Sequence, residues 1–266
     1  MAVDESLFLN IGDEGVVQAF RLYQSNGKSV SLGYFQKNDY LNLDFLREKQ
    51  IAYVRRITGG RAVMQGDDLF IAFTANKKSP FFSGSISKIT NKFADLMVKL
   101  LNEFGVKASV SRRGKLSNDE SVNNFHCFNS LNRNEILVDN KKIIGIALKK
   151  NDDSFLLQAS LLMRIDRELF LNSVNGCNSN TIDSITSLEE QLHREININE
   201  IFTSLKSIFL SEGFAIRDSG LLENEQTDAT YLLENKYRNP AWNNNFKAFL
   251  KENHGERKKK FSAAQK

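Results

Sequence analysis

Between residues 86 and 105 the apolar side chains recur at steps of three and four, the spacing of one face of an α-helix. Serines precede this run and Gly105 follows it, as is usual where helices begin and end. Shorter runs rich in β-branched and aromatic residues have the composition of buried strands and lie on both sides, over 51–56, 69–75 and 155–165. Helical patterns dominate the last third, about 185–250, so we expect an α+β fold.

Local signals predict two β-hairpins. The first joins 16–23 to 30–35 through the turn signal Ser25-Asn26-Gly27, and the second joins 135–138 to 142–148. Both turns carry the asparagine, aspartate or glycine residues that tolerate tight turns.

Helix ends are also marked in the sequence. A residue that can cap a helix is followed three positions later by glutamate at Ser187 with Glu190 and at Asn197 with Glu200. Residues 1–9 and 223–237 have helical patterns, and the second is expected to stop near Pro240.

Composition excludes several classes of protein. With 266 residues, 41% hydrophobic and 26% charged, the chain can bury a sizeable core. It has no run of ~18 apolar residues and begins with an acidic segment, so we expect a cytoplasmic protein without a membrane partner. Its two cysteines, Cys127 and Cys177, make no disulfide framework, and no Cys/His pair has zinc-ligand spacing, so no metal is predicted.

The net charge of +4 lies at one end of the chain. Residues 251–266 contain six basic and two acidic side chains, which leaves the other 250 residues neutral. We therefore expect a single domain over 1–250 and a basic, disordered tail over 251–266. A second interpretation lets the tail attract an acidic protein partner. A nucleic-acid partner is not expected, because Phe261 is the only aromatic residue in the basic run.

A glycine-containing loop is the first candidate for chemistry. In the segment 55–63, two adjacent glycines permit close approach of a ligand, their N–H groups can hold anionic oxygens, and arginines add positive charge. A pair of glycines between two strands is, however, usually only a turn.

Lys142 and Cys127 are the other candidates. An ammonium among apolar neighbours can polarise an acyl carbonyl or hold a carboxylate, although hairpin lysines are more often solvated. Cys127 is either a small buried hydrophobe or a nucleophile whose thiolate needs a nearby cation. Lys142 suits that role better than His126, because consecutive strand side chains point to opposite faces.

Taken in order, these segments resemble the lipoate-protein ligase A family, and within it the cysteine-dependent octanoyltransferases. The resemblance covers residues 1 to about 245 and rests on five motifs: the opening helix 1–7, the segment Ser31-Leu32-Gly33-Tyr34-Phe35-Gln36, the glycine loop 55–63, Cys127-Phe128 before the hairpin 135–145, and Leu233–Tyr237 with Trp242-Asn243.

The resemblance implies a biotin/lipoate-protein-ligase-like catalytic domain with mixed or antiparallel sheets flanked by helices. It implies an acyltransferase that moves an octanoyl or lipoyl group, through a thioester on Cys127, to a lysine of a lipoyl domain. The donor would be octanoyl-acyl carrier protein or lipoate, and the acceptor the glycine cleavage H protein or a 2-oxoacid dehydrogenase acyltransferase subunit. Lys142 would contact the acyl carbonyl, and the substrate-binding residues would be Arg56, Thr58, Gly59, Gly60, Arg61, Gln65, Gly145, Gln158 and Ser160.

Three positions separate the possible activities. Arg61 stands where ATP-using ligases usually have a third glycine, which favours thioester chemistry without a cofactor. Gln65 and Gln158 stand where the family commonly has histidine. The alternatives are an ATP-dependent lipoate-protein ligase, which would use ATP and Mg²⁺, and a catalytically silent family member that binds a lipoyl domain or an acyl ligand.

Overall fold

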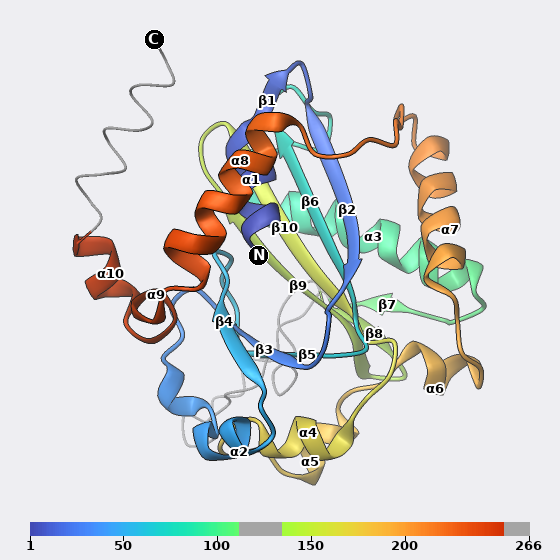
Figure 1. Ribbon diagram of the computed structural model, residues 1–266. Coiled ribbons are helices and arrows are strands. Elements are labelled where there is room, and N and C mark those ends of the chain that lie inside the picture. The colour runs from blue at the N-terminus through green and yellow to red at the C-terminus, as the bar shows by residue number, and fades with distance from the viewer. Residues whose placement is uncertain (112–134, 253–266) are drawn as a thin grey trace.

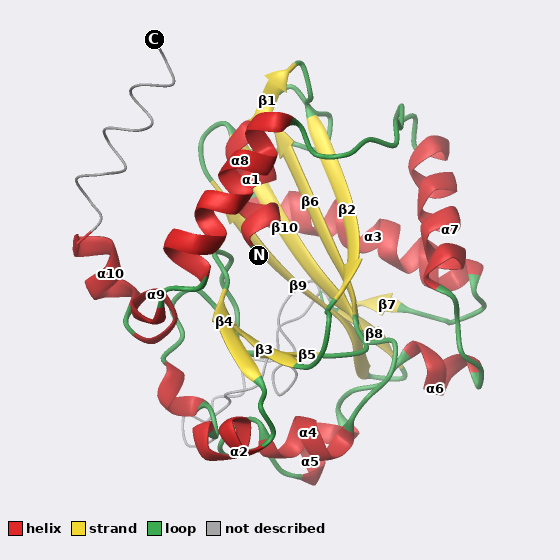
Figure 2. Cartoon of the chain, in the orientation of Figure 1, coloured by secondary structure: helices red, strands yellow, loops and turns green. Residues whose placement is uncertain are grey.

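A six-stranded antiparallel sheet forms the centre of the computed structural model, which describes residues 1–111 and 135–252 (Figures 1 and 2). Its strand order is β2-β6-β10-β9-β8-β7, with bounds β2 Gln18–Gln24, β6 Leu69–Asn76, β10 Ser154–Leu161, β9 Lys141–Lys150, β8 Ile136–Val138 and β7 Ser109–Val110. A short strand, β1 (Ile11–Glu14), precedes β2.

A second sheet of three strands contains β4 (Ala52–Arg55), β3 (Ser29–Leu32) and β5 (Val63–Gln65) in that order. The central strand pairs in parallel with β4 and antiparallel with β5. The predicted hairpin between 16–23 and 30–35 is therefore wrong in its pairing, although both strands exist. The first strand pairs instead with β6, whose eight residues are all buried, and the turn at Ser25-Asn26-Gly27 carries the chain from one sheet to the other.

The second predicted hairpin is confirmed. β8 and β9 are joined through Asp139 and Asn140, which both have positive φ. Positive φ at both central residues is what a two-residue turn of this hand requires. β10 follows as predicted, but it ends at Leu161.

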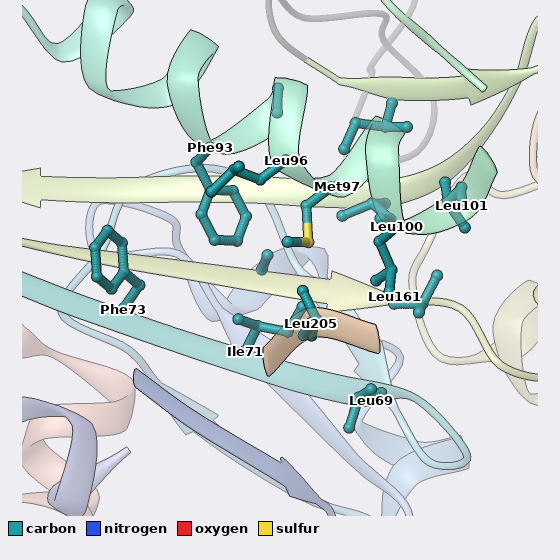
Figure 3. Close-up of a cluster of buried hydrophobic side chains, with 14 of the residues drawn as sticks. Leu69, Ile71, Phe73, Phe93, Leu96, Met97, Leu100, Leu101, Leu161 and Leu205 are labelled. Carbon is teal, nitrogen blue, oxygen red and sulfur yellow. The ribbon is translucent and has the colours of Figure 1, made fainter. Parts of the chain in front are cut away.

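One face of the large sheet is covered by α3 (Ile86–Glu103) and α7 (Ile198–Ser211). The predicted periodic face of α3 packs on alternate residues of β6 and β10, and Figure 3 shows the resulting cluster, including Phe73, Phe93 and Leu161. The capping boxes predicted from spacing both form: Ser187 and Glu190 cap α6 (Leu188–Leu192), and Asn197 and Glu200 cap α7. Three shorter helices lie near the small sheet: α2 Leu43–Glu48, α4 Arg167–Asn172 and α5 Ser179–Asp183.

The other face of the large sheet is covered by α1 (Ala2–Asn10) and α8 (Glu223–Leu232), which contact each other. A π-helical turn extends α8 to Tyr237, so the predicted helix has the expected extent. Pro240 then opens α9 (Pro240–Asn244), and α10 (Phe246–Glu252) follows. The sequence did not predict α10, and its last two residues belong to the segment expected to be a tail.

No helix among the described residues is both long and apolar enough to cross a membrane.

Candidate active site

Strand register brings three of the predicted substrate-binding residues to one face of the large sheet. Gln158 lies opposite Ala147 of β9, and Ser160 lies opposite the buried Gly145. Residues two apart on a strand share a face, so these side chains lie on the same side. The opposite face carries the hydrocarbon core around α3, so this face is available for a polar site.

The glycine loop after β4 lies over this face. The Arg56 guanidinium is buried and donates to the carbonyl oxygens of Ser31 (3.0 Å), Gly59 (2.7 Å) and Arg61 (2.8 Å). These bonds wrap the loop around the arginine. Arg56 is therefore engaged in shaping the loop, whereas the side chain of Arg61 is half-buried.

Two glycines are required where this loop meets the segment before it. Gly60 has φ +90°, which favours glycine, and a Cβ on Gly33 would lie 1.8 Å from the Gly60 carbonyl oxygen. A Cβ on Gly60 would also lie 3.9 Å from the Ala147 Cβ, which places the loop directly over β9. The adjacent glycines are thus more than a turn signal, because they allow backbone segments to approach closely.

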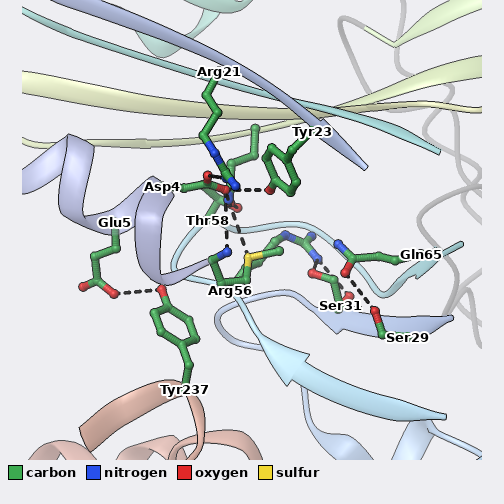
Figure 4. Close-up of polar contacts among 12 residues, drawn as sticks. Asp4, Glu5, Arg21, Tyr23, Ser29, Ser31, Arg56, Thr58, Gln65 and Tyr237 are labelled. Atoms are coloured by element: carbon green, nitrogen blue, oxygen red, sulfur yellow. Dashed lines mark hydrogen bonds and ion pairs between the residues drawn. The ribbon is translucent and has the colours of Figure 1, made fainter. Parts of the chain in front are cut away.

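Buried hydrogen bonds connect the loop to α1 (Figure 4). The Thr58 hydroxyl donates to Gln158 Oε1 (2.7 Å), and Gln158 Nε2 donates to Asp4 Oδ2 (2.7 Å). The Asp4 carboxylate, which is fully buried, also accepts from Arg21 (2.6 Å) and from the Tyr23 hydroxyl (2.7 Å). Burial, reinforced by the Asp4 charge, holds the pKa of Tyr23 well above its usual value, so this phenol stays a neutral donor.

Glu5, the neighbour of Asp4, fixes α1 from the other side. Its carboxylate accepts from the Lys236 ammonium (2.6 and 2.8 Å) and from the Tyr237 hydroxyl (2.8 Å). Burial and this carboxylate raise the pKa of Tyr237 well above its usual value. The two carboxylates therefore join the first helix to the large sheet and to the closing helix.

Gln65 lines a cavity of about 300 Å³. Its side-chain oxygen accepts from the Ser29 hydroxyl at 3.1 Å. The cavity is mainly apolar and is lined by Met1, Ala2, Tyr23, Ser25, Val54, Gln65, Phe70, Leu233, Tyr237 and Arg238. Tyr23 belongs both to this lining and to the Asp4 network, so the cavity adjoins the network.

Ser160 is paired with a carboxyl group that sequence reasoning missed. Its hydroxyl donates to Asp68 Oδ2 at 2.7 Å, and both side chains are buried. Burial raises the pKa of Asp68 from 3.8 to about 7, and the Ser160 hydrogen bond lowers it by less.

Lys142 is buried. The alternative interpretation of it as a solvated hairpin lysine is therefore wrong. Its Nζ is 2.6 Å from Glu135 Oε1, and both side chains are buried. The register of β8 and β9 shifts between Ile136 and Leu137, and the consecutive residues Ile143 and Ile144 both lie in the hydrophobic core. Such a bulge reverses the side to which the residue before it points. The Lys142 side chain therefore lies on the same face of the sheet as Gly145.

Among the predicted site residues, Cys127 lies outside the described residues, so its role stays a prediction. Cys177 is half-buried in a loop and packs against a hydrophobic cluster that includes Val30, Leu169 and Phe170. The residues that the sequence analysis missed are Asp4, Arg21, Tyr23, Asp68 and Glu135. A signal existed for two of them, because Arg21 and Tyr23 are two apart in a predicted strand and therefore share a face.

Residues 1–210 match the model of the lipoyl protein ligase A/B catalytic domain. The chain belongs to this family. That membership confirms the predicted family and the α+β fold, and it makes the protein an enzyme of lipoate protein modification.

Curated relatives of this lipoyl protein ligase A/B family member include octanoyltransferases named LipM. The one from Clostridioides difficile is 28% identical over 254 residues, covering 91% of this chain and 93% of that protein. The one from Lysinibacillus sphaericus is 26% identical over 258 residues, with coverage of 91% and 93%.

Solved structures show the same fold. A putative lipoate protein ligase from T. acidophilum with bound lipoic acid superposes with a TM-score of 0.74 at 23% identity, and a lipoate-protein ligase A bound with ATP superposes with 0.74 at 24% identity. Each comparison covers 91% of both chains.

Proposed function

We propose that the protein transfers an octanoyl group from a carrier-protein thioester to a lysine of a lipoyl domain, with Cys127 as nucleophile. The observation that carries the proposal is the buried ammonium of Lys142, on the face of the sheet over which the glycine loop lies. Octanoyltransferases that match nine-tenths of the chain support the choice of acyl group, and Arg61 in the glycine loop supports a reaction without ATP.

The reaction has two steps. The Cys127 thiolate attacks the carbonyl carbon of the donor thioester, a new C–S bond forms, and the donor leaves as a thiolate. The amine of the acceptor lysine then attacks the acyl-cysteine, an amide forms, and the amine proton passes to the released cysteine thiolate. Lys142 donates a hydrogen bond to the acyl oxygen, where negative charge develops in both steps.

The hydrocarbon chain needs an apolar site. The cavity beside Tyr23, lined by Val54 and Phe70, supplies one next to the Asp4 network.

Gln65 and Gln158 are neutral amides at positions where the family commonly has histidine, and Gln158 already has protein partners on both ends of its amide. Gln158 thus acts by holding the loop in place.

The finer assignments belong to the same proposal. The donor is octanoyl-acyl carrier protein, with lipoate as the alternative, and the acceptor is the glycine cleavage H protein or a 2-oxoacid dehydrogenase acyltransferase subunit in the cytoplasm. A fold neighbour from Thermoplasma acidophilum is described together with its own E2 lipoyl domain, at 21% identity.

The test is intact mass spectrometry after incubation with octanoyl-acyl carrier protein. We expect one octanoyl adduct on the wild type and on Cys177→Ser, and none on Cys127→Ala. Cys177 is the matched control because it is the other cysteine of the chain. An adduct on Cys127→Ala would contradict the nucleophile, and a lipoylated acceptor formed only with lipoate and ATP would assign a ligase. Acceptor binding without product from either donor would assign the silent family member.

The role of Lys142 needs a compensated variant, because removing it alone leaves the Glu135 carboxylate buried without its cation. In Glu135→Gln with Lys142→Met, we expect acyl loading to fall by about 10²–10³, the loss typical for one oxyanion donor. Glu135→Gln alone is the comparison variant: it removes the carboxylate but keeps the Lys142 amine, and it should load faster than the double variant at temperatures where both are fully folded. Equal rates in both variants would remove Lys142 from the chemistry.

A further inference from the structure

A large aromatic side chain is exposed beside the glycine loop. Phe35 is 78% exposed, the highest value among the large hydrophobic residues of the described chain. It follows Gly33, which contacts the Gly60 carbonyl, and Tyr34, whose N–H donates to the Thr58 carbonyl at 2.9 Å. The exposed ring is thus two residues from the backbone contact that shapes the site.

The ring belongs to a small aromatic surface formed by Tyr34, Phe35 and Phe246, which we call the aromatic shelf. The Phe35 ring lies edge-on to Tyr34 (centroids 4.7 Å apart) and to Phe246 (6.3 Å), and the Tyr34 and Phe246 rings are 5.1 Å apart. Phe246 begins α10. The surface therefore joins the segment that follows β3 to the last described helix.

The shelf has a rigid support. The Arg55 side chain is fully buried and donates to the carbonyl oxygens of Gly33, Tyr34 and Gln36. It also donates to the carbonyl oxygens of Trp242 and Asn243 in α9. One guanidinium thus fixes both segments that carry the rings, so Phe35 is held exposed by the fold.

The charge around the shelf is positive. Lys37 and Lys247 are exposed next to its two segments, and the Lys149 ammonium lies 5.2 Å from the centre of the Tyr34 ring. Asp39 is the acidic side chain in the same loop. Lys37, Lys149 and Lys247 outweigh Asp39, so these four side chains carry a net charge of +2.

We infer that the aromatic shelf is the docking surface for an acceptor domain whose own surface is acidic, an inference that rests on the proposed acyl transfer. Exposed aromatic rings on a rigid support bury a large area at little entropic cost, which is how interface hot spots work. Lys37, Lys149 and Lys247 around the shelf attract an acidic partner and speed its encounter. A partner seated there is beside the glycine loop, which belongs to the candidate site of the proposed acyl transfer.

The experiment separates donor loading from transfer to the acceptor. Enzyme loaded from octanoyl-acyl carrier protein is mixed with increasing concentrations of an apo lipoyl domain, and the product is followed by mass spectrometry. We expect Phe35→Ala to raise the KM for the acceptor about 10- to 30-fold, as loss of an aromatic hot spot does, with the rate of donor loading unchanged.

Phe202→Ala is the matched control. Phe202 is 42% exposed on α7, at the opposite side of the molecule from α9 and α10 in Figure 1, and it has a lysine ammonium (Lys206) 5.9 Å from its ring. It should leave both KM and loading at wild-type values. An unchanged acceptor KM in Phe35→Ala, or an equal rise in Phe202→Ala, would overturn the inference.

Salt and charge reversal test the acidic partner. The acceptor KM of the wild type should rise between 50 and 300 mM salt, about the range over which exposed charges become screened, and Lys37→Glu with Lys247→Glu should raise KM at low salt and flatten this dependence. A KM independent of both would contradict an acidic acceptor. If the wild type does not accept an acyl group from the donor, the proposed function is wrong. Docking is then tested by calorimetric titration of the lipoyl domain into the wild type and Phe35→Ala, and the inference requires a weaker affinity in the variant.

Discussion

One face of the six-stranded sheet is packed with hydrocarbon, whereas the other holds a connected set of buried polar side chains. On the first face Ile71, Phe73 and Leu161 interdigitate with side chains of α3 and α7 (Figure 3). On the second face Asp4 and Gln158 link α1 to the glycine loop by hydrogen bonds of 2.7 Å. The same strands build both faces, because successive side chains point to opposite sides.

The apolar face contributes most of the stability, and the polar face holds the candidate site. Apolar burial gives a favourable free energy that grows with area, whereas buried polar groups roughly repay their own desolvation. Substitutions on the apolar face should therefore change the free energy of unfolding most. Those on the polar face should change acyl transfer more than stability.

The largest effect is expected at the centre of the apolar face. Phe73 is buried and its ring lies within 6.4 Å of the rings of Phe20, Phe81, Phe93, Phe155 and Phe209. Phe73→Ala leaves a cavity and should lower the free energy of unfolding by about 3–5 kcal/mol in urea titrations. Loading per folded molecule should stay at the wild-type rate. A loss below about 1 kcal/mol would show that this face does not dominate stability.

The next effect concerns pH and Asp68, whose pKa is raised to about 7 by burial. Between pH 3.8 and 7 the folded state binds a proton that the unfolded state has released, so the free energy of unfolding falls as pH rises through this window. In Asp68→Asn the free energy of unfolding should no longer decrease over this pH window, a difference of up to about 4 kcal/mol from the wild type. Urea titrations at pH 5 and 8 measure it, and identical slopes against pH in both proteins would contradict the raised pKa.

A smaller effect is expected at Asp4. Asp4→Ala leaves Tyr23 and Gln158 without their acceptor and should cost about 2 kcal/mol. Because Gln158 then no longer holds Thr58, the loading rate should fall more than tenfold at temperatures where the variant is fully folded. Loading at the wild-type rate in folded Asp4→Ala would separate the network from the chemistry.

The smallest effect on stability is expected at Gln158. Gln158→Leu removes two hydrogen bonds and should cost about 1 kcal/mol while still slowing acyl loading. Gln158→His tests positioning, because a histidine titrates near pH 6.5, and a protonated ring can still donate to Asp4 but can no longer accept from the Thr58 hydroxyl. We expect loading by Gln158→His to acquire a pH dependence between 5.5 and 7.5 that Gln158→Leu lacks. Parallel pH profiles would indicate that Gln158 only fills space.

Local sequence determined the elements whose interactions are local. The periodic face of α3, the two capping boxes and the β8–β9 turn depend on residues a few positions apart, and all three formed as predicted. The glycine loop was also recognisable, because two adjacent glycines beside arginines permit the close approach that the structure uses at Gly33 and Gly60. The order of motifs along the chain was enough to identify the family.

Tertiary structure decided what depends on distant partners. β2 (Gln18–Gln24) pairs with β6 and not with β3, its neighbour in sequence. Placing the fully buried β6 between two partner strands outweighs the local turn signal. Asp4 becomes a site residue only because Arg21, Tyr23 and Gln158 surround it, from as far as 154 positions away. Likewise Lys142 reaches the polar face through a bulge, because pairing register is set across strands and leaves no mark in the residues themselves.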